Sequence, residues 1–405
     1  MFWHITLTNG SDLVKIEGLL SSSPDLGSYV RRLSILTSEP STLLSLRLVD
    51  RLDYEWAQLL LKLDRVEDLT IRRLYPDSLS EDVKRDLSKY LSNIKRLYVE
   101  DLSWWKHHEM FWFLCAFSKL TAINLVDVQF PLSDMPALSD APAITPTSAV
   151  AIDTLATMQS HDYFLQWLLN GAFHLQLRNL QVRLPSSLRT SRSHELVSSI
   201  ISSSHSTLRA LVLVDPRLTA VADHESYYRD ALAGIINLTS LHLKYIYSDE
   251  NFDSFCSHNI LNVISGMTCF LRWLTPNPHL RRLQMSFKPI SWRHRFDRSV
   301  YDPEMARTDV HHSFKGPWEG MDDALVCLVR QLPHIVIVIN FCIDSESFKF
   351  EDLVSATLSC LPRLVLGEQC RFGIVCGNEW AEDVIFGGEV RRGSGRFEQW
   401  FDFPR

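Results

Sequence analysis

The sequence has no apolar run long enough to cross a bilayer. Its longest strongly apolar stretch is IVIVINFCI at 335–343, whereas a transmembrane helix needs about 20 such residues. The first residues, MFWHITLTNGSDLVKIEG, lack the basic start, the continuous apolar middle and the small-residue cleavage site of a secretory signal. We therefore expect no membrane partner and a cytoplasmic or nuclear location.

An excess of positive charge is also missing. The chain carries 41 Lys and Arg against 48 Asp and Glu, a formal net charge of −7, and these charges are spread over the sequence rather than gathered in a tail. Binding to nucleic acid normally needs a basic patch or stripe. We expect a protein partner and no nucleic acid.

Cysteines are few and widely spaced. They stand at 115, 256, 269, 327, 342, 360, 370 and 376 in apolar surroundings, which is typical of reduced, buried thiols. The one closer pair, Cys370 and Cys376, alternates as in a strand and lacks the second ligand pair of a zinc site. The sequence therefore predicts no disulfide and no metal centre.

Sequence motifs of catalysis are absent as well. There is no G-x-S-x-G, no H-E-x-x-H and no G-x-G-x-x-G after a strand. The glycine-rich segment 386–397 lacks the Lys-Ser/Thr ending of a P-loop and is interpreted as a turn. In WWKHHEMFWF at 104–113 the adjacent His107 and His108 point to different sides of a helix and cannot chelate together. We expect no enzyme and no cofactor.

A six-residue pattern of apolar, two residues, apolar, one residue, apolar occurs nine times. The matches are VRRLSI at 30, LLSLRL at 43, VEDLTI at 66, IKRLYV at 94, LTAINL at 120, LRNLQV at 177, LRALVL at 208, LTSLHL at 238 and LRRLQM at 280. Most intervals between their starts cluster at or just under about 30 residues, the upper edge of the leucine-rich-repeat period. Each unit predicts a short strand with one buried face.

Between these units the apolar residues follow helical spacing. Stripes occur at Leu52–Leu63, Val83–Leu91, Leu196–Ile201 and Tyr228–Ile235. A strand and a helix that alternate bury their apolar faces only when such units stack. The sequence predicts an α/β fold, an irregular leucine-rich-repeat solenoid with parallel strands on the concave face and helices on the convex face.

The predicted solenoid covers residues 1–365, with exposed loop insertions at about 129–150 and 288–320. The first insertion is rich in proline and is followed by an extra helix containing Phe164 and Trp167. After residue 320 the pattern resumes in degenerate form, with strands at 335–343 and 370–376. Residues 366–405 are predicted to form a C-terminal cap packed on the solenoid.

The segment SSSPDLGSYVRRLSI, the recurrent L-x-x-L-x-L strands and a degenerate repeat around LPRLVL together resemble the fungal F-box and leucine-rich-repeat-like proteins. In that family an N-terminal F-box binds the Skp1-type adaptor of a cullin ubiquitin ligase, and the repeats recruit the substrate. The resemblance covers the repeat region only, since no LPxEL-type F-box opening is found in this sequence. It implies a substrate-recognition part, either a fragment or a descendant that has lost the F-box.

The candidate binding residues lie between the inward apolar side chains of the strands and are therefore expected on the concave face. They are Arg96, Tyr98, Asn124, Val126, Asn179, Gln181, Arg183, Val212, Val214, His242, Lys244, Arg282 and Gln284. Tyr98, Arg183 and Arg282 are the expected hot spots, because large planar side chains bury much area and donate hydrogen bonds. The alternative is that these are solvated sheet residues without a partner.

These observations favour a protein-protein recognition scaffold, linked directly or by descent to an SCF-type ubiquitin ligase. One alternative is a structural scaffold without a ligase link. A less favoured one is an enzyme with a site near the 288–320 loop, where His311 and His312 would be the first residues to test.

Overall fold

A computed structural model describes fifteen segments of the chain. They are residues 4–8, 10–36, 59–72, 92–103, 107–129, 150–158, 162–184, 191–214, 222–246, 256–274, 277–288, 318–341, 350–367, 371–376 and 397–402. The chain forms two compact units, Met1–Leu177 and Arg178–Arg405.

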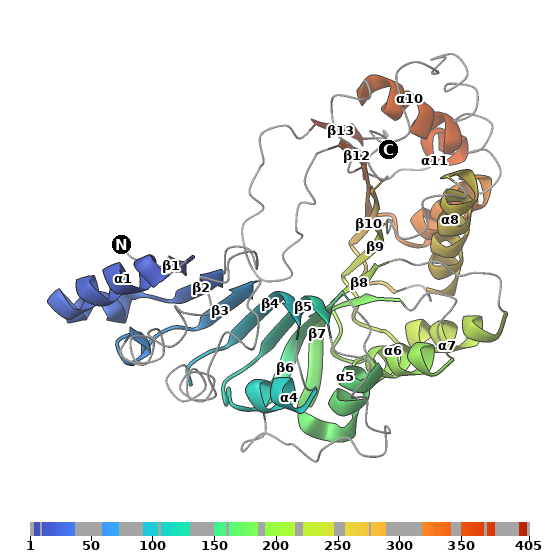
Figure 1. The fold of residues 1–405 in the computed structure, drawn as a ribbon. Helices are drawn as coiled ribbons and strands as arrows, with labels where there is room; N and C mark the ends of the chain where they lie inside the picture. The colour runs from blue at the N-terminus through green and yellow to red at the C-terminus, as the bar shows by residue number, and fades with distance from the viewer. Residues whose placement is uncertain are drawn as a thin grey trace. The chain divides into compact units, whose positions relative to one another are not determined.

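Unit 1 is built on parallel strands, each hydrogen-bonded to the next one along the chain (Figure 1). The strands are β1 (His4–Leu7), β2 (Arg32–Leu36), β3 (Asp68–Arg72), β4 (Arg96–Ser103), β5 (Ala122–Gln129) and β6 (Ala151–Thr157). The helical segments are α1 (Gly10–Ser22), η1 (Pro24–Tyr29), α4 (His107–Cys115), α5 (Asp162–Trp167) and η5 (Leu168–Ala172). Strands and helices thus alternate along the unit.

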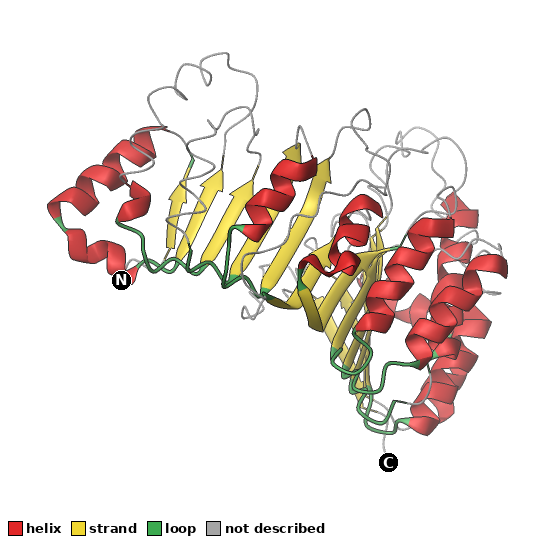
Figure 2. Cartoon of the chain, turned by 90° about the horizontal axis from the view of Figure 1, so that it is seen from below, coloured by secondary structure: helices red, strands yellow, loops and turns green. Residues whose placement is uncertain are grey.

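Unit 2 repeats this plan. Its strands are β7 (His174–Arg183), which begins just before the boundary, β8 (Ala210–Val214), β9 (Ser240–Ile246), β10 (Arg282–Lys288), β11 (Val336–Phe341), β12 (Arg371–Cys376) and β13 (Phe397–Asp402). All pairs are parallel except that β13 runs antiparallel to β12. The helices are α6 (Ser191–Ser203), α7 (Ala222–Ala233), α8 (Cys256–Trp273), a helix at 318–331, α10 (Phe350–Cys360) and α11 (Pro362–Gly367). They lie along one side of the strands (Figure 2).

The last two apolar residues of each six-residue unit form the core side of its strand. Leu180 and Val182 of β7, for example, are 0% and 1% exposed. The residue before a strand donates its N–H to the carbonyl of the equivalent residue in the preceding repeat: Arg209 N lies 2.8 Å from Arg178 O, and Thr239 N lies 2.7 Å from Arg209 O. The hydrogen-bond ladder therefore extends beyond the strands and sets the register of successive repeats.

Aromatic side chains fill the layer between strands and helices. In unit 1 the ring of Phe111 on α4 stacks on Trp167 of α5 with centroids 4.2 Å apart, and Tyr163 lies 5.4 Å from Phe111. In unit 2 the rings of Tyr228 on α7 and Phe270 on α8 are 5.8 Å apart. These contacts join the helices of neighbouring repeats, since a single strand and helix cannot bury their own apolar faces.

The α/β repeat architecture predicted from the sequence is confirmed in each unit. Eight of the nine six-residue units lie on parallel strands, and the ninth, at 43–48, falls outside the described residues. The helical stripes at 196–201 and 228–235 lie on α6 and at the end of α7, with their apolar members buried. The stripe at 83–91 and most of the stripe at 52–63 fall outside the described residues.

Three strands were not predicted: β1, β6 and β13, the last lying in the segment predicted only as a C-terminal cap. β1 has only one alternating pair of apolar residues, Ile5 and Leu7. In β6 the consecutive residues Leu155, Ala156 and Thr157 are all buried, so the alternation that marks a half-buried strand is missing.

The two predicted loops fall largely outside the described residues. The second was expected to reach residue 320, whereas a helix already begins at 318, where Trp318 is 2% exposed and packs 6.0 Å from the ring of Phe287. At the other end, β12 continues the parallel ladder of β11 as predicted for 370–376. The proposed division at residue 365 between the solenoid and a C-terminal cap stays a prediction.

None of the described helices combines the length and the apolarity needed to span a bilayer.

Candidate partner-binding surface

The predicted binding residues align in rows on the strand face opposite the core, here called the outward face. In unit 2 the register places Asn179, Ala210, Ser240 and Arg282 in a first row, and Gln181, Val212, His242 and Gln284 in a second row. A third row holds Arg183, Val214, Lys244 and Ser286. In unit 1, Arg96 pairs with Ala122, Tyr98 with Asn124 and Glu100 with Val126. Within each unit the strands thus bring the predicted residues together in rows.

A network of opposite charges covers the outward face of unit 1. Asp68 on β3 accepts hydrogen bonds from Arg32 Nε at 3.0 Å and from Arg96 Nε at 2.5 Å and Nη2 at 2.7 Å. The hydrogen bonds to Asp68 raise the pKa of Arg96. Since two strands place their arginines on either side of one carboxylate, Asp68 compensates part of the positive charge of this row.

The second row of unit 1 continues this network. Arg72 forms an ion pair with Glu100 at 2.7 Å, and its guanidinium lies 5.2 Å from the ring centroid of Tyr98. Tyr98 donates its hydroxyl to Glu100 at 2.9 Å. The next residue in this row, Asn124, is partly exposed, and its buried Oδ1 has no hydrogen-bond partner among the residues that the structure describes. The planar side chains of Arg72 and Tyr98 are therefore held in place, as an interaction surface requires.

A buried polar network occupies the outward face of β9 to β11. His242 Nε2 and Ser286 Oγ share a hydrogen bond of 2.7 Å. Ser286 Oγ also accepts hydrogen bonds from Asn340 Nδ2 at 3.4 Å and from Gln284 Nε2 at 3.5 Å. A hydroxyl has one donor and two acceptor positions, so these three contacts use all of them when His242 is the acceptor.

The neutral form of His242 is the one that this network requires. Burial, assisted by the positive charges of Lys244 and Arg282, lowers the pKa of His242 from 6.5 to about 3. The distance between Ser286 and His242 is that of a nucleophile and its general base. Ser286 is 0% exposed, however, so a substrate cannot reach its hydroxyl, and the pair acts as a structural contact in the sheet.

The expected exposure is wrong for four of the predicted residues. Val212, Val214, His242 and Gln284 are 6%, 0%, 6% and 6% exposed. Their position on the outward face follows from strand alternation, but alternation does not say whether that face is covered. The other nine predicted residues are exposed or partly exposed, and Arg282 is the only one in the exposed class. Whether any of them binds a partner stays a prediction.

Sequence reasoning did not identify a set of arginines in unit 2. Arg178, Arg209 and Arg281 occupy the second position of their six-residue units and are exposed. They appear in the sequence as the second letter of LRNL, LRAL and LRRL. Strand alternation does not single them out, because they precede the alternating part of each unit.

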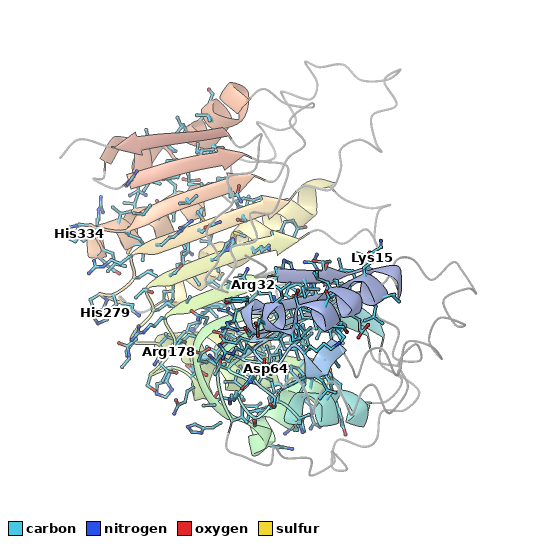
Figure 3. The ribbon with its side chains drawn as sticks, turned by 90° about the vertical axis from the view of Figure 1, so that its left-hand side faces the viewer. Lys15, Arg32, Asp64, Arg178, His279 and His334 are labelled. Carbon is cyan, nitrogen blue, oxygen red and sulfur yellow. The ribbon has the colours of Figure 1, made fainter. Side chains whose placement is uncertain are left out.

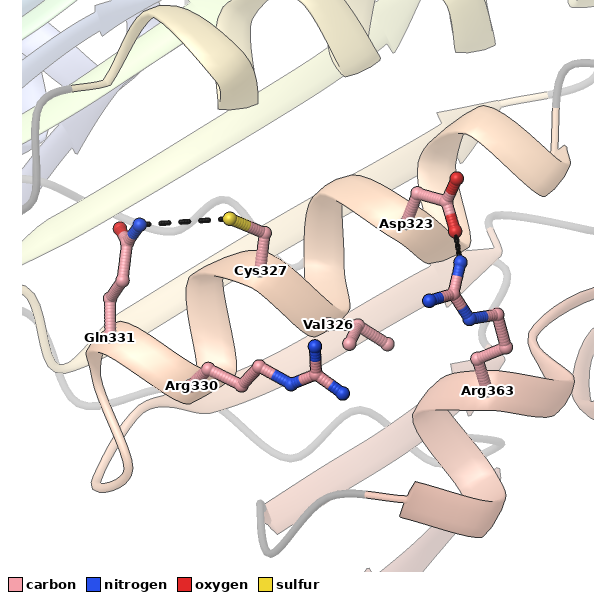
Figure 4. Close-up of a pocket in the computed structure, with 6 residues that line it drawn as sticks. All are labelled: Asp323, Val326, Cys327, Arg330, Gln331 and Arg363. Atoms are coloured by element: carbon pink, nitrogen blue, oxygen red, sulfur yellow. Dashed lines mark hydrogen bonds and ion pairs between the residues drawn. The ribbon is translucent and has the colours of Figure 1, made fainter.

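The outer side of the helix at 318–331 carries a polar cavity of about 410 Å³ (Figure 4). It is lined by Asp323, Val326, Cys327, Arg330, Gln331 and Arg363. Arg363 pairs with Asp323, while the neighbouring Asp322 is buried and accepts the backbone N–H of Arg363 and Leu364, each at 2.9 Å. These contacts fix α11 to the helix at 318–331, so the cavity is explained by helix packing.

The described residues offer no cluster of three His, Cys, Asp or Glu side chains suited to a metal ion. In the described segments Cys115, Cys269, Cys327 and Cys360 are not joined in disulfides. Burial raises the pKa of the Cys115 thiol to about 12, which disfavours the reactive thiolate.

Comparison with known proteins gives no relative by sequence. No protein-family model matches the chain, and no curated protein matches it. Among solved structures, one similar chain comes from the crystal structure of the Rad7 and Elc1 complex in yeast. It shares 10% sequence identity, with 85% of this chain and 87% of that chain covered, at a TM-score of 0.30.

Proposed function

We propose that this chain is a protein-recognition scaffold whose partner binds the outward face of the strands. The observation that carries the proposal is the alignment of partly exposed polar, aromatic and arginine side chains into rows on that face. In unit 2 the helices lie along the other side of the strands (Figure 2). Side chains on a rigid sheet bind with little loss of conformational entropy.

The composition of the face favours a macromolecule over a small molecule. Small-molecule sites are concave and mostly apolar, whereas the rows contain Asn179, Gln181 and Arg183 on β7 and Tyr98 on β4. Tyr and Arg are the residues that contribute most at protein interfaces. A non-enzymatic binding role is therefore proposed.

Photo-cross-linking from defined positions tests this proposal. A photoreactive amino acid replaces Tyr98 or Gln181 on the outward face. In control proteins it replaces Val14 of α1 or Gln331 of the helix at 318–331, which are exposed on helices. The expected result is one reproducible set of cross-linked proteins from Tyr98 and Gln181 that is absent from the controls. Cross-links from the helix positions alone would contradict the proposal.

The link to a ubiquitin ligase rests on the sequence resemblance to F-box and leucine-rich-repeat-like proteins and is proposed on that basis. Affinity purification of the full chain tests it, with mass spectrometry for a Skp1-type adaptor or a cullin among the recovered proteins. Recovery of either supports the ligase link. Recovery of a partner set without them supports the structural scaffold. A cytoplasmic or nuclear location stays a prediction.

A further inference from the structure

The beginnings of the six-residue units in unit 2 form a basic edge. It consists of Arg178 within β7, Arg209 immediately before β8, and Arg281 and Arg282 at the start of β10. All four side chains are exposed. Figure 3 shows Arg178 on the side where these strands begin, together with His279 and His334 of the turns before β10 and β11.

The backbone fixes the spacing of this edge. Arg209 N donates to Arg178 O at 2.8 Å, Thr239 N to Arg209 O at 2.7 Å and Arg281 N to Thr239 O at 2.9 Å. Adjacent strands are about 4.8 Å apart. The arginines of β7 and β8 are therefore one strand apart, and Arg281 follows two strands later, after Thr239.

Acidic residues are missing from this edge. The turns that lead into β8, β9, β10 and β11, at 204–209, 234–239, 277–281 and 332–335, contain none. Among the described residues no carboxylate forms an ion pair with Arg178, Arg209, Arg281 or Arg282, and Arg282 donates instead to Gln284 Oε1 at 2.9 Å. The positive charge of the edge is therefore not balanced locally.

Unit 1 provides the contrast. Its corresponding positions hold Glu67 and Asp68 as well as basic residues. Lys95 pairs with Glu67 at 3.2 Å, and Asp68 lies between two arginines. The same backbone positions are thus neutralised in one unit and left basic in the other, so stacking of the repeats does not by itself require the arginines of unit 2.

We propose that the basic edge of unit 2, formed by Arg178, Arg209, Arg281 and Arg282, binds an acidic polypeptide segment of the partner. This inference rests on the proposed recognition function and names the chemistry of its ligand. Guanidinium groups bind carboxylates through paired hydrogen bonds, and an extended segment rich in Asp or Glu matches a linear row of arginines. The edge adjoins the partly exposed first row, so one partner can contact both.

A polypeptide is favoured over nucleic acid for two reasons. Proteins that bind nucleic acid commonly contact six to ten phosphates, whereas this edge offers four arginines. The whole chain also has a formal net charge of −7, which repels a long polyanion. A short acidic segment gains the local attraction with less of this repulsion.

Binding of a glutamate-rich synthetic peptide to the full chain, measured by fluorescence anisotropy, tests the inference. The test variant carries Arg178→Glu, Arg209→Glu and Arg281→Glu. The control variant carries the same change of charge at exposed helix positions, through Lys15→Glu, Arg192→Glu and Arg272→Glu. We expect the peptide to bind the wild type, to bind less tightly as salt rises, and to bind the test variant about tenfold more weakly or worse. The control variant should lose much less.

Other results would overturn the inference. They are no binding of the peptide to the wild type, equal loss in both variants, or tighter binding of a single-stranded oligonucleotide than of the peptide. Circular dichroism of each variant establishes that it is folded, and if the triple variant is unfolded, Arg209→Gln alone is compared with Arg272→Gln.

The proposed function is tested separately by the cross-links from Tyr98 and Gln181. If these capture a partner from the wild type and from the test variant equally well, recognition stands and the acidic-segment inference fails. If the peptide binds but no cross-linked partner is found, the basic edge stands and the outward-face proposal fails.

Discussion

One buried residue on the outward face, His242, makes the stability of unit 2 depend on pH. His242 is 6% exposed, and its Nε2 is the acceptor that Ser286 needs. The folded-state pKa of His242 is about 3, below its ordinary value of 6.5. A proton on the ring would replace the acceptor with a second donor beside Lys244 and Arg282. The network is therefore compatible with the neutral ring only.

The free energy of unfolding should consequently fall in acid. The unfolded chain takes up a proton at His242 below pH 6.5, whereas the folded chain does so only near pH 3, so stability is lost as pH falls through this interval. Between about pH 7 and about pH 5 we expect a loss of about 2 kcal/mol that is absent from His242→Gln. Urea unfolding of both proteins at each pH measures the difference. Equal losses in the two proteins would contradict the assignment.

The backbone of Lys62 leaves no room for a side chain at Gly27. A Cβ at this position would lie 2.0 Å from the backbone oxygen of Lys62, which has no freedom to rotate away. We expect Gly27→Ala to lower the free energy of unfolding by about 1–3 kcal/mol, as overpacking does. Thermal and chemical denaturation measure this loss.

Gly18 on α1 is the matched control for that substitution. A Cβ at Gly18 meets nothing within 4 Å, and alanine is favoured over glycine in a helix by about 1 kcal/mol. Gly18→Ala should therefore leave stability unchanged or raise it slightly. Similar losses for Gly18→Ala and Gly27→Ala would show that close packing at Lys62 is not the cause.

At the scale of the element, α11 depends on one buried carboxylate. Asp322 is 2% exposed and accepts the N–H groups of Arg363 and Leu364, which have no acceptor within their own helix. Asp322→Ala should reduce the free energy of unfolding by about 1–2 kcal/mol, because the cap is lost and the N–H groups remain buried. Chemical denaturation measures the change.

The adjacent Asp323 tests whether charge alone explains that effect. Its ion pair with Arg363 joins side chains that are 45% and 58% exposed, and exposed pairs contribute about 0–1 kcal/mol. Asp323→Ala should therefore be much milder than Asp322→Ala. If the two variants lose the same stability, capping is not the dominant interaction.

The elements also show how far sequence periodicity predicts this fold. The pattern found eight described strands because each carries three apolar residues at fixed offsets. It missed β1, which is four residues long, β6, where the alternation breaks at Leu155 to Thr157, and β13, which lacks the three-residue apolar pattern. It also placed His242 and Gln284 on the correct strand face but did not predict their burial, because periodicity distinguishes the two faces of a strand and does not say which residues of a face are buried.

At the scale of the whole molecule, the two compact units should differ in their response to local damage. Repeat proteins draw their stability from contacts between neighbours, so a defect spreads little beyond the repeats that it touches. Phe111, buried between Tyr163 and Trp167, is central to the aromatic stack of unit 1. Phe270 has a similar role beside Tyr228 and Trp273 in unit 2.

Phe111→Ala should cost about 3–5 kcal/mol in the repeats that lose the ring, because a large cavity replaces it. Hydrogen exchange followed by mass spectrometry should then show faster exchange in β4 to β6, while β9 to β11 keep their protection. Phe270→Ala is the reciprocal control and should produce the opposite distribution. Uniform loss of protection along the chain in both variants would mean that all repeats unfold together, and the division into separately responding units would be wrong.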